Sequence, residues 1–521
     1  MTDWNYIVVG GGSAGSLLAS RLTENPACEV LLLEAGPDYL AKDTPIEFKD
    51  RSKGLGLALE APRNYLNPEF YWHGITATRA KGQLAFPYRR GRGLGGSSTI
   101  NGLYAIRGIP DDFAEWERLG AEGWGPDVML RAYCRIEDEH DFPAQPFHAS
   151  GGPTPVYREP ASGWGGVDKA LKAAALENGY GWNPDHNDPS STGVSPMAMN
   201  IRDGDRVSTN HAYIDPARNR KNLTVRGDVL VDQIIFDGLV AVGVEDASGR
   251  QYRVQDGGEV ILSAGAAASP AILLRSGIGP ADDLLTLGIH QRLELPVGRG
   301  AQDHPVSFIE MPVDPEAQIC VGNRPTNIVV RYSSGLPGGR RNDMMILATN
   351  HNYWFGKETA GLAVSLEQPL SRGRMRLSSA DPEVEPHFDF NFLSDPRDLA
   401  RIKDGLSRAR TLIDHEAFHE IATGSPSETQ DDAEIIATVK DTMHLCSTAR
   451  MGRPGDPDTV VDSRCRVVGI DNLRVVDASI MPTVVSANTY LTVLALAEVF
   501  LERNPDLLSG HRNSILLIEG S

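Results

Sequence analysis

The fold of this chain is decided by residues 5–15, which read NYIVVGGGSAG. A short apolar run leads into a cluster of glycines, and Ser13 to Thr23 then has the composition of a helix. A second apolar run, Glu29 to Leu33, ends at Glu34. Strand, glycine turn, helix and strand within about 30 residues form the βαβ unit that opens a dinucleotide-binding domain.

Within this unit, Gly10, Gly12 and Gly15 form the pattern GxGxxG. We expect Gly10 to permit the tight turn, Gly12 to let a diphosphate approach the backbone, and Gly15 to let the helix pack on the strand. Glu34 follows the second strand, where an acid can bond the hydroxyls of a ribose. FAD and NAD both contain ADP, so this pattern alone does not separate them.

Composition excludes several classes of protein. The 521 residues exceed the usual size of one domain, and 41% hydrophobic with 23% charged residues is ordinary for a globular protein. A net charge of −19 argues against nucleic acid as a partner. Five cysteines without a CxxC spacing suggest neither a disulfide framework nor a metal site. Without a signal peptide or a membrane-spanning apolar run, we expect a cytoplasmic protein with no membrane span.

Further along the chain, the pattern predicts a second kind of sheet. Residues 306–313, 327–332 and 343–348 are strand-like runs, which favour an antiparallel sheet and hence a second domain. Residues 396–413 and 428–443 have helical composition, as do residues 111–135. The predicted fold class is therefore α/β, with a Rossmann-like domain and an α+β domain built on an antiparallel sheet.

Two longer motifs carry a resemblance to a known family. Residues 90–101, RGRGLGGSSTIN, and 265–270, GAAASP, continuing to SGIG at 276–279, resemble the two signatures of the glucose–methanol–choline (GMC) oxidoreductases. The short stretches QDHP at 302–305, SRG at 371–373 and NLRVVDAS at 472–479 agree. The resemblance extends from Tyr6 to about Glu502, and within the family it points to the bacterial branch that holds 5-hydroxymethylfurfural oxidase and pyridoxine 4-oxidase.

The resemblance implies FAD as the cofactor and an interleaved domain order. We expect the FAD-binding domain in residues 1–155, 201–304 and 441–510, and the substrate domain in residues 156–200 and 305–440. The segment 441–510 carries the expected catalytic pair. Some family members attach FAD to a histidine just before the signature asparagine; here Ile100 stands there, which implies non-covalent FAD.

Cofactor contacts are expected from the glycine loops, from nearby hydroxyl and amide groups, and from positions that match the family's motifs. Val229 is expected to meet the adenine side through its backbone, and Asp477 could instead be structural. The full set is Gly10, Gly12, Ser13, Ala14, Gly15, Glu34, Ala35, Arg92, Gly95, Gly96, Ser97, Asn101, Gly102, Val229, Asp477, Ala478, Asn488 and Thr489.

The expected catalytic pair is His444 and Asn488, because their segments resemble the family's catalytic motif. Oxidising an alcohol requires loss of the hydroxyl proton and transfer of a hydride to the flavin. Histidine can accept the proton, and Asn488 can hydrogen-bond the same oxygen. His304, in the QDHP stretch, is expected to form a turn near the flavin rather than to act in catalysis. Trp72, Tyr353, Trp354 and Phe355 are candidates for the substrate pocket.

The leading hypothesis is oxidation of a primary alcohol, with the hydroxymethyl group on a small aromatic or heteroaromatic ring, and with oxygen as electron acceptor. The alternative is a choline-like dehydrogenase that passes electrons to a quinone or another carrier. A catalytically silent flavin protein, or a lyase or photodecarboxylase, stays open at this point. The sequence does not indicate an oligomeric state.

Overall fold

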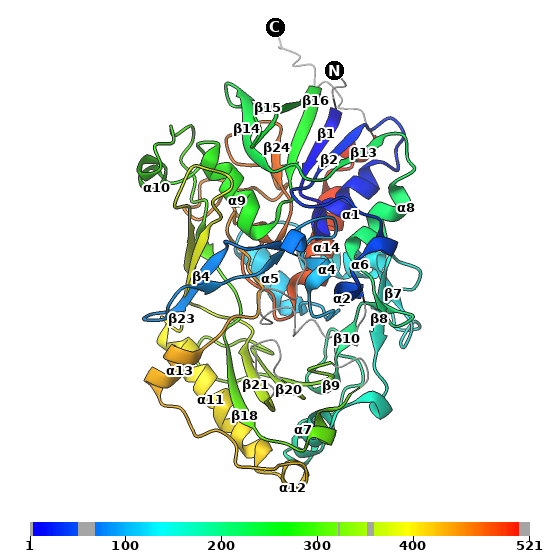
Figure 1. The fold of residues 1–521 in the computed structure, drawn as a ribbon, viewed down its shortest axis with the longest axis vertical. Coiled ribbons are helices and arrows are strands. Elements are labelled where there is room, and N and C mark those ends of the chain that lie inside the picture. Colours follow the sequence, from blue (N-terminus) through cyan, green and yellow to red (C-terminus); the bar gives the residue numbers. More distant parts are fainter. Residues whose placement is uncertain (1–3, 50–67, 321–323, 352–358, 510–521) are drawn as a thin grey trace.

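The computed structural model describes residues 4–49, 68–320, 324–351 and 359–509. Two sheets of different kind lie at opposite ends of the molecule (Figure 1). The upper one is mainly parallel and lies near both chain ends, and the lower one is antiparallel. This arrangement confirms the predicted fold class; the domain boundaries given above stay a prediction.

The parallel sheet forms from the runs with the strongest apolar character. Its parallel strands lie in the order β13-β2-β1-β16-β24, and β14 and β15 extend the sheet from β16 as an antiparallel meander. Val30 to Leu33 are fully buried, as expected for a strand covered on both faces. The strands are β1 (Trp4–Val9), β2 (Val30–Leu33), β13 (Leu223–Arg226), β14 (Val231–Asp237), β15 (Val240–Asp246), β16 (Gln251–Leu262) and β24 (Leu473–Val475).

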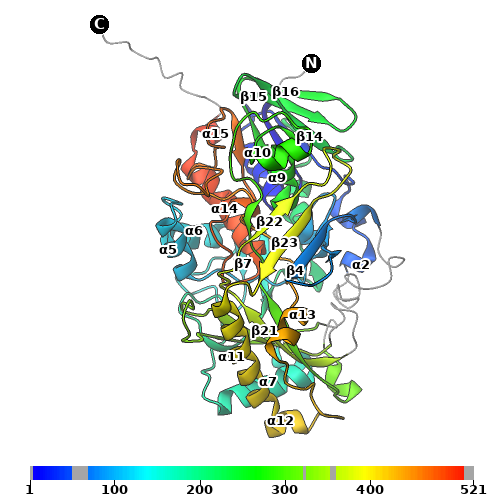
Figure 2. The same cartoon turned by 90° about the vertical axis from the view of Figure 1, so that its left-hand side faces the viewer.

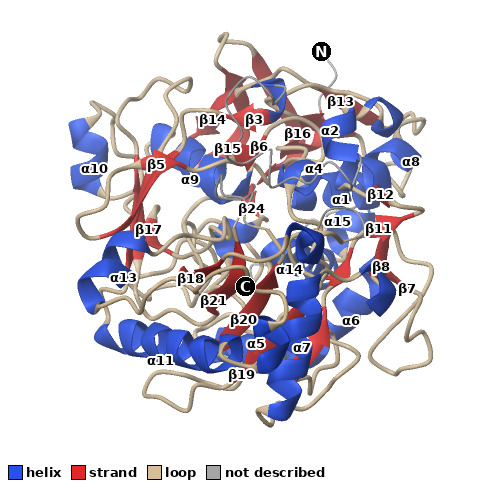
Figure 3. Cartoon of the chain, turned by 60° about the horizontal axis from the view of Figure 1, so that its bottom comes forward, coloured by secondary structure: helices blue, strands red, loops and turns tan. Residues whose placement is uncertain are grey.

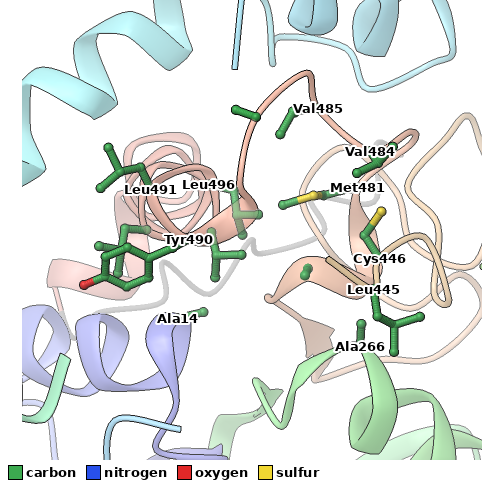
Figure 4. Packing of buried hydrophobic residues seen from close by; sticks show 14 of the residues in the cluster. Ala14, Ala266, Leu445, Cys446, Met481, Val484, Val485, Tyr490, Leu491 and Leu496 are labelled. Atoms are coloured by element: carbon green, nitrogen blue, oxygen red, sulfur yellow. The ribbon is translucent and has the colours of Figure 1, made fainter. Parts of the chain in front are cut away.

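Two helices contact this sheet, α1 (Ser13–Leu22) at β1 and β2 and α9 (Gly265–Arg275) at β14, and α14 (Thr489–Arg503) packs against α1. Residues Thr489 to Leu501 of α14 are all buried, so this helix runs through the core. Figure 4 shows Tyr490 of α14 near Ala14 of α1, and Leu445 close to Ala266 of α9. The core thus joins the chain's first helix to the segment around residue 445.

The antiparallel sheet has the strand order β18-β21-β20-β19-β9. Its strands are β9 (Gly193–Pro196), β18 (Val306–Met311), β19 (Ile328–Tyr332), β20 (Met344–Thr349) and β21 (Ala360–Leu366). Helices α7 (Gly166–Glu177) and α11 (Pro396–Ile413) cover one face, with α12 (Glu416–His419) against α7 (Figures 2 and 3). At Gly405 of α11 a Cβ would lie 2.5 Å from Val364 Cγ1, so helix and sheet approach closely there.

Smaller elements connect the two sheets. A third sheet, β17-β22-β23-β4-β5, flanks them, and Figure 2 shows β4, β22 and β23 between the ends of the molecule. Its strands are β4 (Thr76–Ala80), β5 (Phe86–Pro87), β17 (Arg299–Ala301), β22 (Gly373–Arg376) and β23 (His387–Phe392).

The short remaining strands are β3 (Tyr71–Trp72), β6 (Arg90–Gly91), β7 (Glu137–Glu139), β8 (Thr154–Arg158), β10 (Ala198–Met199), β11 (Ile201–Arg202) and β12 (Asp205–Arg206). The other α-helices are α2 (Ile46–Lys49), α4 (Ser97–Ile100), α5 (Pro110–Arg118), α6 (Pro126–Ile136), α8 (Asp215–Ala217), α10 (Ala281–Thr286), α13 (Asp432–Thr438) and α15 (Asp506–Ser509).

Two helix predictions were wrong in extent. Residues 111–135 form two helices, α5 and α6, because Gly120 and Gly123 adopt positive φ angles and Pro126 starts the second helix. Residues 428–443 are helical only in α13, since Lys440 pairs with Val306 in a β-bridge and Met443 has a φ of 63°. The C-terminal part of this range matters, because the irregular segment after α13 positions His444 on the pocket wall.

All five cysteines are free thiols. Within the described part of the chain, no helix combines the length and apolar character needed to cross a membrane.

Candidate active site

One pocket of about 340 Å³ takes its walls from both large sheets and from the start of α14. It brings together most of the predicted site residues. On its wall lie Gly10, Gly12, Ser13, Ala14, Glu34, Ala35, Gly96, Ser97, Asn101, Gly102, Val229, His444, Asp477, Ala478, Asn488 and Thr489. Three predicted residues are absent from the wall: Gly15, Arg92 and Gly95.

The first glycine turn shows why each glycine is there. Gly10 has a φ of 99°, and a Cβ on it would lie 2.6 Å from the Ser263 carbonyl oxygen. A Cβ on Gly15 would lie 1.8 Å from the Gly10 carbonyl oxygen, so Gly15 serves the packing of α1 on its strand. A Cβ on Gly12 would meet only Gly96 Cα, in ordinary van der Waals contact at 3.9 Å, and Gly12 lies on the pocket wall. A flat ligand can therefore approach the backbone at Gly12.

Glu34 holds the loops around this turn. Its carboxylate accepts hydrogen bonds from the backbone N–H groups of Gly11 at 2.7 Å, Gly93 at 2.9 Å and Gly36 at 3.0 Å. The side chain is 6% exposed and lies on the pocket wall. Sequence analysis expected a ribose contact alone; the structure shows that the same carboxylate also ties two glycine loops to the end of β2.

The second glycine loop packs directly on the first. The Gly95 N–H donates to the Gly11 carbonyl at 2.8 Å, which explains why Gly95 is not on the wall. Arg92 also lies behind the wall, where it donates to the Ala35 carbonyl at 2.9 Å. Asn101, at the end of α4, is fixed by Arg206, which donates to its Oδ1 at 2.6 Å and to its carbonyl at 2.7 Å. Sequence analysis missed Arg206, since no local pattern links it to this loop.

Asp477 is 2% exposed and accepts hydrogen bonds from Ser269 Oγ at 2.5 Å, the Ser479 N–H at 2.8 Å and the Gly265 N–H at 2.9 Å. Burial raises the pKa of this carboxyl. Its bonds bring the start of α9 to the end of β24 and place Ala478 on the wall. The geometry matches the structural alternative noted for Asp477.

The residues present fit FAD. The first turn of α1 has neither a side-chain cap nor an acidic residue, and its start, from Gly12 to Ala14, lines the pocket, as binding of a diphosphate requires. The N-terminus of α14 opens onto the same pocket without a side-chain cap. Val229 and Asn488 thus line the same continuous pocket, which has places for both ends of a dinucleotide.

His444 and Asn488 lie at the end of this pocket that the antiparallel sheet closes. Asn488 Nδ2 is 3.0 Å from His444 Nε2, and both residues are on the wall. The His444 ring is held from behind by two groups: His304 Nδ1 lies 2.9 Å and Thr442 Oγ1 2.8 Å from His444 Nδ1. The ring therefore presents Nε2 to the pocket.

The tautomer of His444 follows from its neighbours. His304 Nε2 is 2.9 Å from the Val485 carbonyl, which can only accept, so Nε2 of His304 carries the proton. In the neutral ring, Nδ1 of His304 is then an acceptor for the Nδ1–H of His444. Thr442 supports the same assignment, because its hydroxyl donates to Asp303 and leaves its oxygen as an acceptor. His444 Nε2 thus carries a lone pair that faces the pocket.

A single buried carboxylate organises this arrangement. Asp303 Oδ1 accepts from the backbone N–H groups of His304 at 2.7 Å and His444 at 2.9 Å, and Oδ2 accepts from the Tyr88 hydroxyl at 2.6 Å. Burial and the neighbouring Asp441 raise the pKa of Asp303. Sequence analysis placed residues 302–305 in a turn near the flavin, and it missed the contact of His304 with His444.

The electrostatics keep His444 neutral. Burial lowers its pKa well below the ordinary value of 6.5, and the neighbouring His304 and Arg90 lower it further. An imidazole with an unprotonated Nε2 is the form that can accept a proton from a hydroxyl group.

The antiparallel sheet supplies the opposite wall. Alternate residues of three strands face the pocket: Val306 and Phe308 of β18; Met345, Leu347 and Thr349 of β20; Ala363 and Ser365 of β21. Glu367, just after β21, adds one carboxylate to this mainly apolar surface. Trp72 is also on the wall, whereas Tyr353, Trp354 and Phe355 lie outside the described residues.

Comparisons with known proteins agree with this geometry. Two family models described as GMC oxidoreductase match residues 4–306 and 369–497. The chain is 36% identical to 5-(hydroxymethyl)furfural oxidase of Methylovorus sp. (strain MP688), with 96% of this chain and 98% of that protein aligned. It is 34% identical to the mitochondrial choline dehydrogenase of Homo sapiens, over 95% of this chain and 89% of that protein.

Among solved structures, pyridoxine 4-oxidase from Mesorbium loti superposes with a TM-score of 0.85 at 30% identity, covering 96% of this chain and 98% of that one. Formate oxidase superposes with a TM-score of 0.84 at 23% identity, which shows the shared fold. The matched segments include both glycine loops and the His444 and Asn488 segments. The chain therefore belongs to the GMC oxidoreductases, FAD-dependent enzymes that act on CH–OH donors.

Proposed function

We propose that the chain oxidises a primary alcohol, with its hydroxymethyl group on a small aromatic or heteroaromatic ring, to the aldehyde, and that oxygen accepts the electrons. The observation that carries the proposal is that His444 Nε2 lies 3.0 Å from Asn488 Nδ2, with both residues on the pocket wall. The similarity to 5-(hydroxymethyl)furfural oxidase and to pyridoxine 4-oxidase supports the ring as the substrate class.

In this proposal the two side chains share the substrate oxygen. The alcohol hydroxyl donates to His444 Nε2, and Asn488 Nδ2 donates to the same oxygen as negative charge develops on it. The proton moves to Nε2, and His304 and Thr442 stabilise the resulting imidazolium through its Nδ1–H. Bound FAD supplies the hydride acceptor. The apolar wall of Met345 and Leu347 holds the ring and keeps water from the reacting carbon.

The residues proposed to hold FAD are those on the pocket wall, with Gly15, Gly95 and Arg92 supporting them from behind. Ile100 is on the wall where some relatives of the family carry a linking histidine, and it has no nucleophilic atom. We therefore propose non-covalent FAD. Acid precipitation should release the flavin into solution, and a yellow pellet would contradict the proposal.

A second candidate function is a choline-like dehydrogenase that uses a quinone or another carrier. The observation that favours it is Glu367, a carboxylate that is 4% exposed on the pocket wall and suits a cationic alcohol. The 34% identity to choline dehydrogenase supports the same candidate. A cytoplasmic location stays a prediction for either function.

One experiment separates the candidates. The holoenzyme is mixed without oxygen with benzylic, furanic, pyridinyl and aliphatic alcohols and with choline, and loss of flavin absorbance at about 450 nm is followed. We expect fastest reduction by ring-bound hydroxymethyl groups, then rapid reoxidation with peroxide formation when air is admitted. Fastest reduction by choline, or a reduced flavin that persists in air, would favour the second candidate.

A further inference from the structure

A second cavity, of about 190 Å³, lies away from the flavin pocket and is lined by an arginine that forms no ion pair within the described part of the chain. Arg331 of β19 is 1% exposed and lines this cavity. It pairs in register with Met345 of β20, which lies on the wall of the flavin pocket. Arg331 therefore lies on the inner face of the antiparallel sheet, opposite to the face that α11 covers.

Most other buried arginines in the described chain have a carboxylate partner or several hydrogen bonds. Five of them bond carboxylates: Arg79 with Asp441, Arg107 with Glu137, Arg158 with Glu139 and Asp185, Arg401 with Asp398, and Arg474 with Glu259. Arg206 donates to four oxygens of its surroundings. Arg331 has a single bond, from Nη1 to the His186 carbonyl at 3.3 Å.

The two other nitrogens of Arg331, Nε and Nη2, are buried without a hydrogen-bond partner among the described residues. A guanidinium stays charged in proteins, and burying it with unsatisfied N–H groups is unfavourable. Nε and Nη2 carry the two N–H groups that point the same way from one edge of the guanidinium. This fork matches the two oxygens of a carboxylate.

The remaining walls of the cavity agree with a carboxylate that carries a small apolar group. Ile109, Phe113 and Leu130 line it beside Arg331. His186 also lines it; its Nδ1 lies 2.8 Å from Ser195 Oγ, and its Nε2 is buried without a partner in the described structure. Nε2 of His186 is thus a further donor when Ser195 donates to Nδ1. Asp127 and Asp188 on the wall disfavour an anion of higher charge.

We propose that this cavity binds a small monocarboxylate, with its two oxygens on Nε and Nη2 of Arg331 and its apolar part against Ile109, Phe113 and Leu130. The site is separate from the flavin pocket and does not rest on the alcohol assigned above. Because Arg331 and Met345 are paired across two strands and point to the same face of the sheet, the bound anion lies beside the substrate wall.

The test uses the holoenzyme with sodium acetate and sodium benzoate as probes, and sodium chloride at equal ionic strength as the reference. Binding is followed by calorimetry and by the rise in melting temperature. We expect saturable binding of one carboxylate per chain. Arg331→Met should weaken the affinity at least about tenfold, in keeping with the loss of a charge-assisted pair of hydrogen bonds. The matched surface variant Arg202→Met should bind as the wild type does.

Two further measurements test the carboxylate site if Arg331→Met does not fold. Arg331→Lys keeps the charge and removes the fork, so it should also weaken binding, and crystals grown with benzoate should show the carboxylate at Arg331. Water alone in that density, or equal affinity in the wild type and both variants, would overturn the proposal. Benzoate that competes with the alcohol, with an inhibition constant unaffected by Arg331→Lys, would place the anion in the flavin pocket and overturn it equally.

Discussion

The two walls of the flavin pocket differ in composition, because one consists mainly of main-chain atoms and the other of side chains. Toward the parallel sheet, the wall is largely backbone: Gly10, Gly12 and Gly96 bring main-chain atoms to the surface, and Glu34 ties their loops together. Toward the antiparallel sheet, it consists of side chains that alternate along strands, such as Met345 and Leu347. Substitutions in the first wall therefore disturb the path of the backbone, whereas a substitution in the second wall changes only one side chain of the pocket.

The largest expected effect concerns the backbone wall. Gly15→Ala should abolish soluble holoenzyme, because its Cβ would lie 1.8 Å from the Gly10 carbonyl oxygen. Gly12→Ala, in the same motif, should leave the apoprotein's melting temperature nearly unchanged, since its Cβ meets only Gly96 Cα at 3.9 Å. It should nevertheless lower flavin retention, which is measured by absorbance after gel filtration. Equal behaviour of the two variants would contradict the division of roles within the motif.

The next effect concerns the group behind the catalytic pair. His304→Leu removes the acceptor for the His444 Nδ1–H, and flavin reduction by alcohol should slow about 10- to 100-fold through misplacement of the base. His304→Gln can both accept from His444 and donate to the Val485 carbonyl, so it should restore most of the rate. Stopped-flow reduction without oxygen measures both. Equal rates in the two variants would show that His304 only fills space.

A smaller effect is expected from pH. Because the pKa of His444 is lowered below 6.5, its base form persists into mildly acidic solution. The rate of flavin reduction should stay level as pH falls to about 6.5 and decline only below that value. Arg90→Met removes a positive charge that lowers this pKa, so the decline should begin at higher pH. A rate that already falls between pH 8 and 7 in the wild type would contradict a buried, neutral His444.

The smallest effect on catalysis concerns the side-chain wall. Leu347→Ala should change the KM for the alcohol a few-fold and leave flavin retention unchanged, since Leu347 faces the pocket. Its neighbour Ile346 is fully buried and absent from the pocket wall, so Ile346→Ala should instead lower the free energy of unfolding by about 2–5 kcal/mol. Alcohol kinetics and urea unfolding of both variants check this. A change of KM in Ile346→Ala alone would reverse the assignment of the two faces.

The same contrast explains what could be predicted from the sequence. Gly10, Gly12 and Gly15 report a local backbone requirement, so the strand–turn–helix unit was predictable from eleven residues. The pairing of His444 with Asn488 came from the resemblance of their segments to a family. The contact of His304 with His444 joins residues 140 apart, and no local pattern announces it. The wall of Met345 and Leu347 depends on strand register, which only the folded sheet sets.

In the proposed reaction, His444 accepts the alcohol proton while hydride passes to the flavin. Flavin reduction by the fastest alcohol is followed without oxygen in the wild type and in His444→Ala, after their flavin contents have been shown to be equal. We predict that His444→Ala reduces its flavin at least about a hundredfold more slowly, within the usual range for loss of a general base. An unchanged rate of reduction at equal flavin content would contradict the account.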